Sequence, residues 1–320
     1  MAILEVRDLA VRIGPLTPLD GIGFDVDKGE VLGIVGESGS GKSLTAMSVM
    51  GLLPLIGGRV ERGSIRFAGG ELVGLDEPAY RRLRGRRLAL ITQNPMTSLD
   101  PLQRVGAQVD QVSRLHLKLG PAAARSRSIE IMDQLRIPRA ATVHGQYPHQ
   151  LSGGMKQRIV IAMALAADPD LIIADEPTTA LDVTIQAQII DLLAELVRVR
   201  GLALVLITHD MGVVAQACDR VVVLYAGRVA ESDGTAAIFA DPRHPYTRAL
   251  IGCIPRDGLA RGGLQGIPGL VPSVADYATG CRFAPRCALA LGACRASAPP
   301  VVAHGSRRIA CHVSGAPADG

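Results

Sequence analysis

A glycine-rich segment at residues 36–43, with the sequence GESGSGKS, has the composition of a phosphate-binding loop. Glycines at 36, 39 and 41 allow backbone N–H groups to turn inward around phosphate oxygens, and a helix beginning directly afterwards would point its positive dipole end at the same anion. Lys42 supplies a positive charge for the β- and γ-phosphates, and the Ser43 hydroxyl can bind Mg²⁺. The apolar run Val31–Val35 precedes the loop, so the sequence predicts strand, loop and helix in the order that such a site requires.

Two carboxylates follow another apolar run. Leu171–Ala174 predicts a strand buried inside a parallel sheet, with Asp175 and Glu176 at its carboxyl end, where such sheets bind ligands. Two acids at this place suggest a metal ion and a water, which together form half of a phosphoryl-transfer site. The segment therefore predicts a partner for the glycine-rich loop.

Gln93 and His209 each end a further apolar run, Leu88–Thr92 and Leu202–Thr208. Gln93 precedes a Pro-containing loop and could sense a γ-phosphate or a metal-bound water, or it could be a polar cap on a strand; the residues leave both open. A lone histidine is more often structural, but His209 ends a strand of the same predicted sheet, which favours a functional role.

A second glycine-rich turn, Ser152, Gly153 and Gly154, precedes a predicted helix and forms another helix amino terminus suited to phosphate. One chain cannot easily place both such sites on one nucleotide, so the second could serve a nucleotide held by a partner. Asp182 lies just before a predicted amphipathic helix and could simply be its N-cap.

The remaining patterns place these motifs in an α/β protein. Residues 1–30 alternate apolar and polar side chains as antiparallel strands do, residues 57–87 read as short strands and turns, and residues 102–150 have helical periodicity. The run RVVVLYAGRVAE at 220–231 predicts a closing hairpin.

Composition excludes several classes of protein. With 320 residues, 48% hydrophobic and 3% aromatic, the chain has room for one large domain and a smaller one. A net charge of +4 is too small to indicate a nucleic-acid surface. The amino terminus has no secretory pattern and no apolar run reaches the length of a membrane helix, so we expect a cytosolic protein. The arginines at 81, 82, 84, 86 and 87 are most simply a solvated face, with contact to anionic lipid as the minority interpretation.

Four of the six cysteines, Cys281, Cys287, Cys294 and Cys311, lie in a segment rich in Pro and Gly. Disulfides are not expected in a reducing compartment. Because the segment has little apolar content, a metal centre could supply its folding energy, and four thiolates suit tetrahedral zinc or an iron–sulfur cluster. Free thiols are the third possibility, and His312 is either a spare ligand or an exposed side chain.

In combination, these motifs resemble the ATP-binding subunit of an ABC transporter across residues 1–240. The resemblance implies a P-loop NTPase (RecA-like) core sheet, an antiparallel β subdomain and an α-helical subdomain at about residues 95–165. It also implies ATP and Mg²⁺ as cofactors and ATP hydrolysis as the reaction.

The family's roles then fall on the matching positions. Residues 36–43, including Ser38, Gly39, Ser40 and Gly41, correspond to Walker A, and Gln93 to the Q-loop. Asp175 would hold Mg²⁺ together with Ser43 and Gln93, Glu176 would be the general base, and His209 the switch histidine. Ala180–Asp182 (ALD) matches the D-loop, and Ser152, Gly153 and Gly154 match the signature that covers the ATP of the opposite subunit.

One family feature is missing, because the stretch that usually carries an adenine-stacking aromatic has Arg12 and Ile13 instead. Stacking of a base on an aromatic ring is worth roughly 1–3 kcal/mol. Ile13 could still give the base an apolar contact.

The carboxyl-terminal runs DPRHPYTRALIGCIPR (Asp241–Arg256), IPGLVPS and GCRFAPRC resemble the extension of the oligopeptide/dipeptide importer branch, which includes some nickel importers. The resemblance implies an extension at 241–320 with a [4Fe–4S] cluster on Cys281, Cys287, Cys294 and Cys311, zinc being the alternative. It also implies a second ATPase subunit, two membrane permeases, an extracytoplasmic peptide-binding protein and a peripheral place on the cytoplasmic face of the membrane, with no nucleic acid.

Other functions are weaker alternatives. Nickel, haem or glutathione could be the cargo. A soluble ABC ATPase acting on nucleic acid would usually carry coiled-coil inserts or two fused modules, and neither occurs here. A regulatory module without hydrolysis is disfavoured by the intact Lys42, Asp175, Glu176 and His209.

Overall fold

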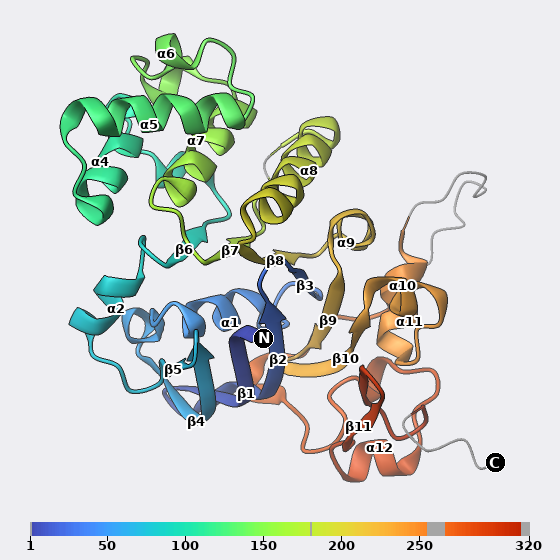
Figure 1. Ribbon diagram of the computed structural model, residues 1–320. Helices are drawn as coiled ribbons and strands as arrows, with labels where there is room; N and C mark the ends of the chain where they lie inside the picture. The colour runs from blue at the N-terminus through green and yellow to red at the C-terminus, as the bar shows by residue number, and fades with distance from the viewer. Residues whose placement is uncertain (1, 180, 255–265, 315–320) are drawn as a thin grey trace. The chain divides into compact units, whose positions relative to one another are not determined.

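The computed structural model describes residues 2–179, 181–254 and 266–314 and divides into two compact units (Figure 1). The first unit holds residues 27–30 and 74–206, and the second holds residues 2–26, 31–73 and the chain from 207 onward. Ala180, Pro255 and Arg256, which belong to motifs named above, lie outside the described residues.

Parallel strands form the sheet of the first unit. β6 (Leu88–Ile91) pairs in parallel with β7 (Leu171–Asp175), from Leu88 opposite Leu171 to Ile91 opposite Ala174, and β8 (Ala203–Thr208) begins beside β7. The first four residues of β7 are fully buried, as expected for a strand covered on both faces. Asp175 and Glu176 therefore lie at the carboxyl end of this strand.

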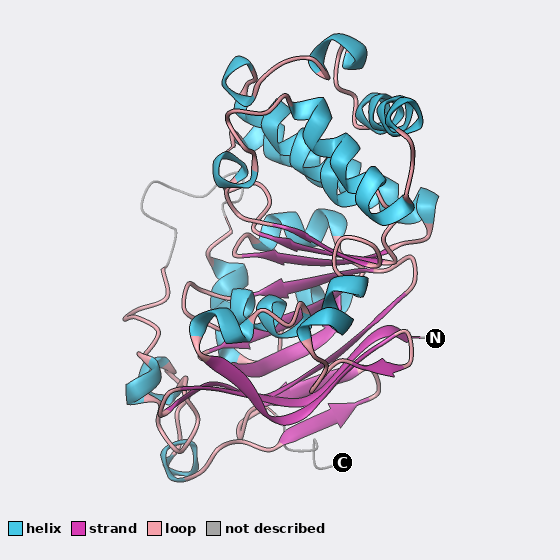
Figure 2. Cartoon of the chain, turned by 90° about the vertical axis from the view of Figure 1, so that its left-hand side faces the viewer, coloured by secondary structure: helices cyan, strands magenta, loops and turns pink. Residues whose placement is uncertain are grey.

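Helices make up most of the first unit. α4 (Val105–Leu117), α5 (Pro121–Gln134) and α7 (Gly153–Leu165) contact one another, with the single turn α6 (Ala140–Val143) against α5. Figure 1 shows this group, and Figure 2 shows it as a cyan bundle without strands. The shorter α3 (Pro95–Ser98) contacts α7, and the amphipathic α8 (Val183–Arg200) buries Ile189, Leu193 and Val197.

An antiparallel sheet opens the second unit. β1 (Ala2–Ile13), β2 (Leu16–Asp27), β4 (Gly58–Phe67) and β5 (Gly70–Glu71) are ordered β2-β1-β4-β5. Leu4 and Val6 of β1 and Ile22, Phe24 and Val26 of β2 alternate along their strands and are buried, so the period-two pattern of residues 1–30 does form antiparallel strands with one covered face.

The second unit also contains the strand that leads into the glycine-rich loop. β3 (Val31–Val35) pairs in parallel with β9 (Arg220–Tyr225), and β9 forms the predicted hairpin with β10 (Arg228–Gly234). α1 (Lys42–Val49) follows the loop, α9 (Met211–Ala217) precedes β9, and α10 (Thr235–Ala240) and α11 (Pro245–Gly252) follow the hairpin.

The C-terminal segment adds two strands beside β10. β12 (Arg307–Ala310) pairs with β10 through Glu231 opposite Ile309, and β11 (Val301–His304) pairs with β12. The short helix α12 (Gly292–Ala296) precedes these strands. The division predicted at residue 240 stays a prediction.

Asp20 of β2 joins three distant segments of the second unit. Its backbone N–H donates to the carbonyl of Gly227 over 2.9 Å, and its carboxylate accepts from Arg228 over 2.6 Å. Arg282 Nη2 lies 3.5 Å from the same carboxylate. The two ends of the chain are therefore tied together within this unit.

Residues 57–87 contain a helix that the sequence analysis missed. α2 (Glu77–Leu83) begins after Asp76, whose side chain accepts from the Ala79 N–H over 2.8 Å, and Pro78 stands in its first turn. An Asp followed by Pro is a helix-start signal, so the DEPA sequence could have revealed this helix.

Within the arginine run in and after this helix, Arg81, Arg82 and Arg86 are exposed, as a solvated face predicts, whereas the other two are half-buried. Arg84 donates to Glu77 over 2.9 and 3.0 Å, Arg87 donates to Asp170 over 2.6 Å, and Arg86 donates to the Ala167 carbonyl. These arginines therefore hold parts of the first unit together. Among the described residues, no helix is both long and apolar enough to cross a membrane.

Candidate functional site

The loop at 36–43 runs from β3 to α1, as predicted, and its backbone requires glycine. Gly36 has φ +154°, and a Cβ added there would stand 2.2 Å from the Leu224 carbonyl oxygen. Gly41, the N-cap of α1, has φ +103°. A side chain at Gly36 would therefore clash with the backbone of Leu224 and with the Ser40 side chain, so the loop can take this path only with glycine at that position.

Lys42 lies inside this loop. It is 6% exposed, and its Nζ donates to the carbonyls of Gly36 (2.8 Å) and Glu37 (3.1 Å). Ser43 is exposed on the first turn of α1, and the Ser40 hydroxyl is buried without a hydrogen-bond partner. A buried lysine, an unsatisfied hydroxyl and a helix amino terminus fit a phosphate group, so these residues are suited to the predicted nucleotide and Mg²⁺.

In the first unit, β7 ends at Asp175 and places Glu176 at the start of the following turn. Glu176 has φ +47°, which is uncommon for a residue other than glycine, and such backbone is found more often at functional sites. Its Oε2 accepts from Gln93 Nε2 over 3.2 Å and from Thr179 Oγ1 over 2.8 Å. The structure thus brings together two predicted residues that are far apart in sequence, and it adds Thr179, which the sequence analysis did not single out.

The glycine-rich turn at 152–154 and the segment around Asp182 line one pocket of about 400 Å³ in the first unit. Ser152 is the N-cap of α7, and its hydroxyl accepts from the Met155 N–H over 3.4 Å. A Cβ on Gly154 would lie 2.8 Å from Ile185, so this glycine allows α7 to approach α8 closely. Asp182 occupies the N-cap position of α8 but makes no capping hydrogen bond with its side chain.

His209 follows β8 directly and is exposed, in the second unit. The next residue, Asp210, caps α9 by accepting from the N–H of Gly212 over 2.7 Å. This cap begins a helix immediately after the histidine, so His209 lies in the short connection between a buried strand and α9.

Arg12, at the place where the family usually has an aromatic residue, is held by another side chain. Its Nε donates to Glu61 over 2.6 Å, so the guanidinium is paired along the antiparallel sheet. The role of Ile13 in contacting a base stays a prediction.

The predicted metal centre of the C-terminal segment is wrong. Cys281, Cys287, Cys294 and Cys311 form no disulfide, and within the described ranges no group of three or more His, Cys, Asp or Glu side chains could hold a metal ion. This result excludes the predicted [4Fe–4S] cluster, and the zinc alternative, on Cys281, Cys287, Cys294 and Cys311. Burial raises the pKa of the Cys281 and Cys287 thiols, which favours the protonated form over the thiolate that a metal needs.

Packing of aromatic side chains, and not a metal, stabilises the C-terminal segment. Phe283, which is 4% exposed, contacts the rings of Tyr225 (5.1 Å between centroids) and Tyr246 (5.3 Å). The low apolar content of the segment predicted that it needs a metal for its folding energy. It instead shares the core of the second unit, and this contact between distant segments has no local signal in the sequence.

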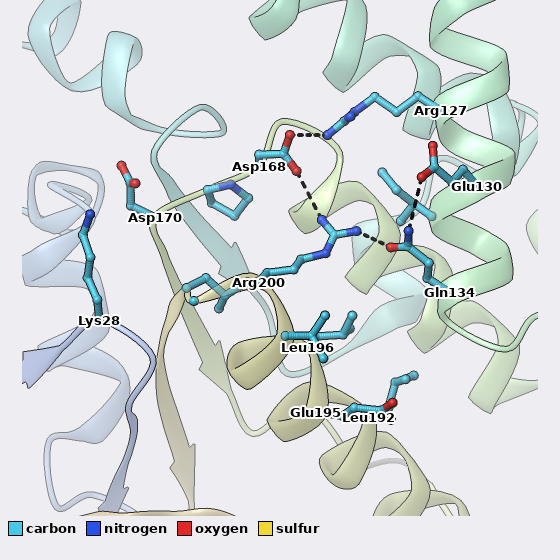
Figure 3. A pocket seen from close by; sticks show the side chains of 15 residues that line it. Lys28, Arg127, Glu130, Gln134, Asp168, Asp170, Leu192, Glu195, Leu196 and Arg200 are labelled. Atoms are coloured by element: carbon cyan, nitrogen blue, oxygen red, sulfur yellow. Dashed lines mark hydrogen bonds and ion pairs between the residues drawn. The ribbon is translucent and has the colours of Figure 1, made fainter.

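A separate hollow of about 820 Å³ in the first unit contains none of the predicted site residues (Figure 3). Asp168 accepts there from Arg127 over 2.6 Å and from Arg200 over 3.2 Å, and Gln134 accepts from Arg200. The figure shows these side chains pointing toward one another across α5 and α8. The charges satisfy one another, so the hollow does not indicate a ligand.

Comparisons with known proteins agree with the resemblance to ABC transporter subunits that the sequence motifs indicated. The family profile described as ABC transporter matches residues 19–179, and that described as oligopeptide/dipeptide transporter, C-terminal region, matches residues 230–294. The dipeptide transport ATP-binding protein DppD of Haemophilus influenzae is 45% identical over 316 residues, covering 98% of this chain and 96% of the relative. DppD of Escherichia coli is 46% identical over 318 residues, covering 98% and 97%.

Solved structures confirm the α/β fold. An ATP-binding cassette solved as a dimer in a post-hydrolysis state with ADP and Pi superposes with a TM-score of 0.64 at 26% identity, covering 72% of this chain and 98% of that one. CbiO1 from Clostridium perfringens, described as part of an ABC transporter complex, gives 0.66 at 28% identity, covering 75% and 91%. The chain therefore belongs to the ABC transporter family of ATP-binding proteins, and it is an ABC ATPase with the C-terminal region of oligopeptide/dipeptide transporters.

Proposed function

We propose that this chain is the ATPase subunit that powers the import of dipeptides or oligopeptides. The observation that carries the proposal is the presence in one chain of two separate glycine-rich helix starts, both of a kind suited to phosphate. One is the loop at 36–43 in the second unit, and the other is the pocket at Ser152–Gly154 and Asp182 in the first unit. In a pair of such subunits, the Ser152–Gly154 signature of each chain would cover the ATP at the partner's loop. Both elements would then be used.

The chemical roles follow from the family's motifs at the matching positions of this chain. Lys42 would bind the β- and γ-phosphates, and Ser43, Gln93 and Asp175 would hold Mg²⁺, which would supply charge neutralisation when bound. Glu176 takes the proton of the attacking water as general base. The hydrogen bonds from Gln93 and Thr179 orient its carboxylate for this task.

His209 completes the proposed site. Its side chain is exposed directly after the buried β8, and by the family's motif it would contact the γ-phosphate. The cap of α9 at Asp210 fixes the connection that carries it. His209 thus acts as the residue that distinguishes ATP from ADP.

The proposed cargo and partners rest on the relatives. The relatives that are 45% and 46% identical over nearly the whole chain are described as dipeptide transport ATP-binding proteins. We extend this cargo to the present chain, together with a second ATPase subunit, two permease subunits and an extracytoplasmic peptide-binding protein. The chain then works as a peripheral subunit on the cytoplasmic face of the membrane.

The Glu176→Gln variant tests the hydrolysis role in the complex with the partner ATPase, whose own site is silenced. We expect ATP hydrolysis to fall at least about 100-fold while ATP binding is retained, because the amide keeps the shape of the side chain but cannot accept a proton. Glu195→Gln, on the exposed face of α8, is the matched control and should hydrolyse ATP normally. Undiminished hydrolysis by Glu176→Gln would contradict the assignment of the general base.

Cargo is tested separately in vesicles that contain the purified transporter and its binding protein. Uptake of a radiolabelled dipeptide should require ATP on the side of the ATPase subunits and should be lost in the Glu176→Gln complex. ATP-dependent uptake of Ni²⁺ with no uptake of dipeptide would refute the peptide assignment without affecting the ATPase assignment.

A further inference from the structure

Glu37, the second residue of the phosphate-binding loop, is held at three points. Its carbonyl accepts from Lys42 Nζ over 3.1 Å, and its backbone N–H donates to the hydroxyl oxygen of Tyr246 over 2.9 Å. Its carboxylate accepts from both terminal nitrogens of Arg286, over 2.8 and 2.9 Å. Two of the three partners belong to the C-terminal part of the chain, more than 200 residues from the loop.

Arg286 is itself built into the C-terminal segment. Its side chain is 6% exposed, its Nε donates to the Pro268 carbonyl over 2.8 Å, and its Nη2 donates to the Gly269 carbonyl over 3.2 Å. The paired carboxylate raises the pKa of Arg286, so the guanidinium stays charged. Planar, bidentate pairs of this kind fix geometry as well as charge.

Tyr246 is anchored equally firmly. It is fully buried on α11, and its ring lies edge-on to Tyr225 with 4.7 Å between centroids. Tyr225 in turn accepts a hydrogen bond from Arg286 over 3.3 Å. One cluster of buried side chains therefore holds both the backbone and the side chain of Glu37.

The charge of Glu37 matters because the loop that carries it must bind a polyanion. A carboxylate beside the triphosphate repels it, and this repulsion is strong where water is partly excluded. Glu37 is 29% exposed on its side chain, so solvent screens its charge only in part. The Arg286 guanidinium neutralises that charge before any nucleotide arrives.

We propose that Arg286 and Tyr246 are positioning residues of the nucleotide site, through which the C-terminal segment neutralises Glu37 and fixes the phosphate-binding loop. The proposal deepens the proposed function, since it assumes that this loop binds ATP. It makes the affinity for nucleotide depend on whether the C-terminal segment is seated.

The first test measures nucleotide affinity of the full chain by calorimetry. In Arg286→Met, the Kd for MgATP should rise about 10-fold or more, the Kd for MgADP should rise less, and weak binding of adenosine should not change. Glu37→Gln added to Arg286→Met should restore most of the MgATP affinity, because it removes the uncompensated charge. Arg295→Met, at an exposed position of α12, is the matched control and should bind MgATP like the natural chain.

The comparison of MgATP, MgADP and adenosine distinguishes a positioning role of Arg286 from a general destabilisation of the chain. A merely structural role of Arg286 would weaken all three ligands equally and would not be rescued by Glu37→Gln, and either result would overturn the proposal. Arg286→Lys, which keeps the charge but loses the bidentate geometry, should lie between Arg286→Met and the natural chain.

A second measurement does not depend on nucleotide binding. Hydrogen exchange of the nucleotide-free chain should become about 10-fold faster in the loop at 36–43 for Arg286→Met and for Tyr246→Phe, and should be unchanged for Arg295→Met. Unchanged exchange in the loop would overturn the proposal. Faster exchange in a chain whose natural form does not bind MgATP would support the positioning role while refuting the proposed function.

Discussion

Arg307 neutralises two buried carboxylates, and replacing it by Met should detach the C-terminal strands from the second unit. Its Nε donates to Asp233 over 2.8 Å, and its Nη1 lies 3.8 Å from Glu231. The side chains of Arg307, Asp233 and Glu231 are 12%, 8% and 0% exposed. Water therefore cannot replace the lost cation without local opening.

Removing one partner of a buried ion pair costs about 3–5 kcal/mol. We expect the lower end of this range, because both carboxylates keep other donors. Asp233 accepts from Ser306, and Glu231 accepts from the backbone N–H groups of Arg243 and His244 over 3.0 and 2.9 Å. A loss of about 3 kcal/mol corresponds to a roughly 100-fold increase in the equilibrium constant for opening.

The pH dependence of this loss has a definite sign. Burial alone would raise the pKa of Asp233, but hydrogen bonds from Arg307 and Ser306 outweigh it and lower the pKa below the ordinary 3.8. The ion pair therefore stabilises the folded chain above pH 3.8, and its contribution is lost as the pH falls through the folded pKa. The difference between the natural chain and Arg307→Met should shrink in the same range.

Hydrogen exchange is the suitable assay, since the chain has no tryptophan to report unfolding by fluorescence. At pH 7 the amides of β12 should exchange about 100-fold faster in Arg307→Met, and less than about 3-fold faster in the exposed control Arg295→Met. Asp233→Asn in the Arg307→Met background should recover part of the protection. Equal exchange in the Arg307→Met and Arg295→Met variants would refute the reasoning.

Three further predictions concern single residues. Gly36→Ala should weaken MgATP binding at least about 100-fold in calorimetry, because its Cβ would stand 2.2 Å from a carbonyl oxygen, whereas Gly292→Ala, with open space around it, should bind normally. Ser152→Ala should lower the free energy of unfolding by about 1 kcal/mol, because the helix cap is lost. It should abolish hydrolysis by the assembled pair but leave the Kd of the isolated chain for MgATP unchanged. A raised Kd would contradict the assignment of Ser152 to the partner's nucleotide. Burial lowers the pKa of His244 to about 4, so the chain should lose stability as the pH falls from about 6.5 to about 4. In urea unfolding, His244→Asn, which can still cap α11, should lose less stability than the natural chain over that window, and an equal pH dependence would contradict this explanation.

The sequence was sufficient to predict those strands and loops whose structure depends only on neighbouring residues. The run Val31–Val35 forms β3 with those bounds, and the loop and helix after it follow from glycine geometry and a helix start. Leu171–Ala174 likewise forms a buried strand, extended by one residue to Asp175. In each case an unbroken apolar run, with a turn signal after it, leaves little alternative to a buried strand.

The contacts that organise the site are not local, and the sequence could not supply them. Gln93 and Glu176 are 83 residues apart, and Glu37 and Arg286 are 249 apart. The cysteine-rich segment was misinterpreted for the same reason. Its composition alone suggested a metal centre, whereas Phe283 packs on tyrosines that come from other elements of the unit.

The tie between the two ends of the chain at Asp20 has a consequence for the order of folding. The first unit consists mainly of the continuous segment 74–206, so it can form while the rest of the chain is still being synthesised. The second unit needs Arg228 and Arg286, which lie 208 and 249 residues beyond their partners Asp20 and Glu37. Closing such long loops is slow, and the ribosome must deliver nearly the whole chain first. The phosphate-binding loop is thus made early but acquires its C-terminal supports last, so a chain that is cut short leaves the ribosome without a completed nucleotide site.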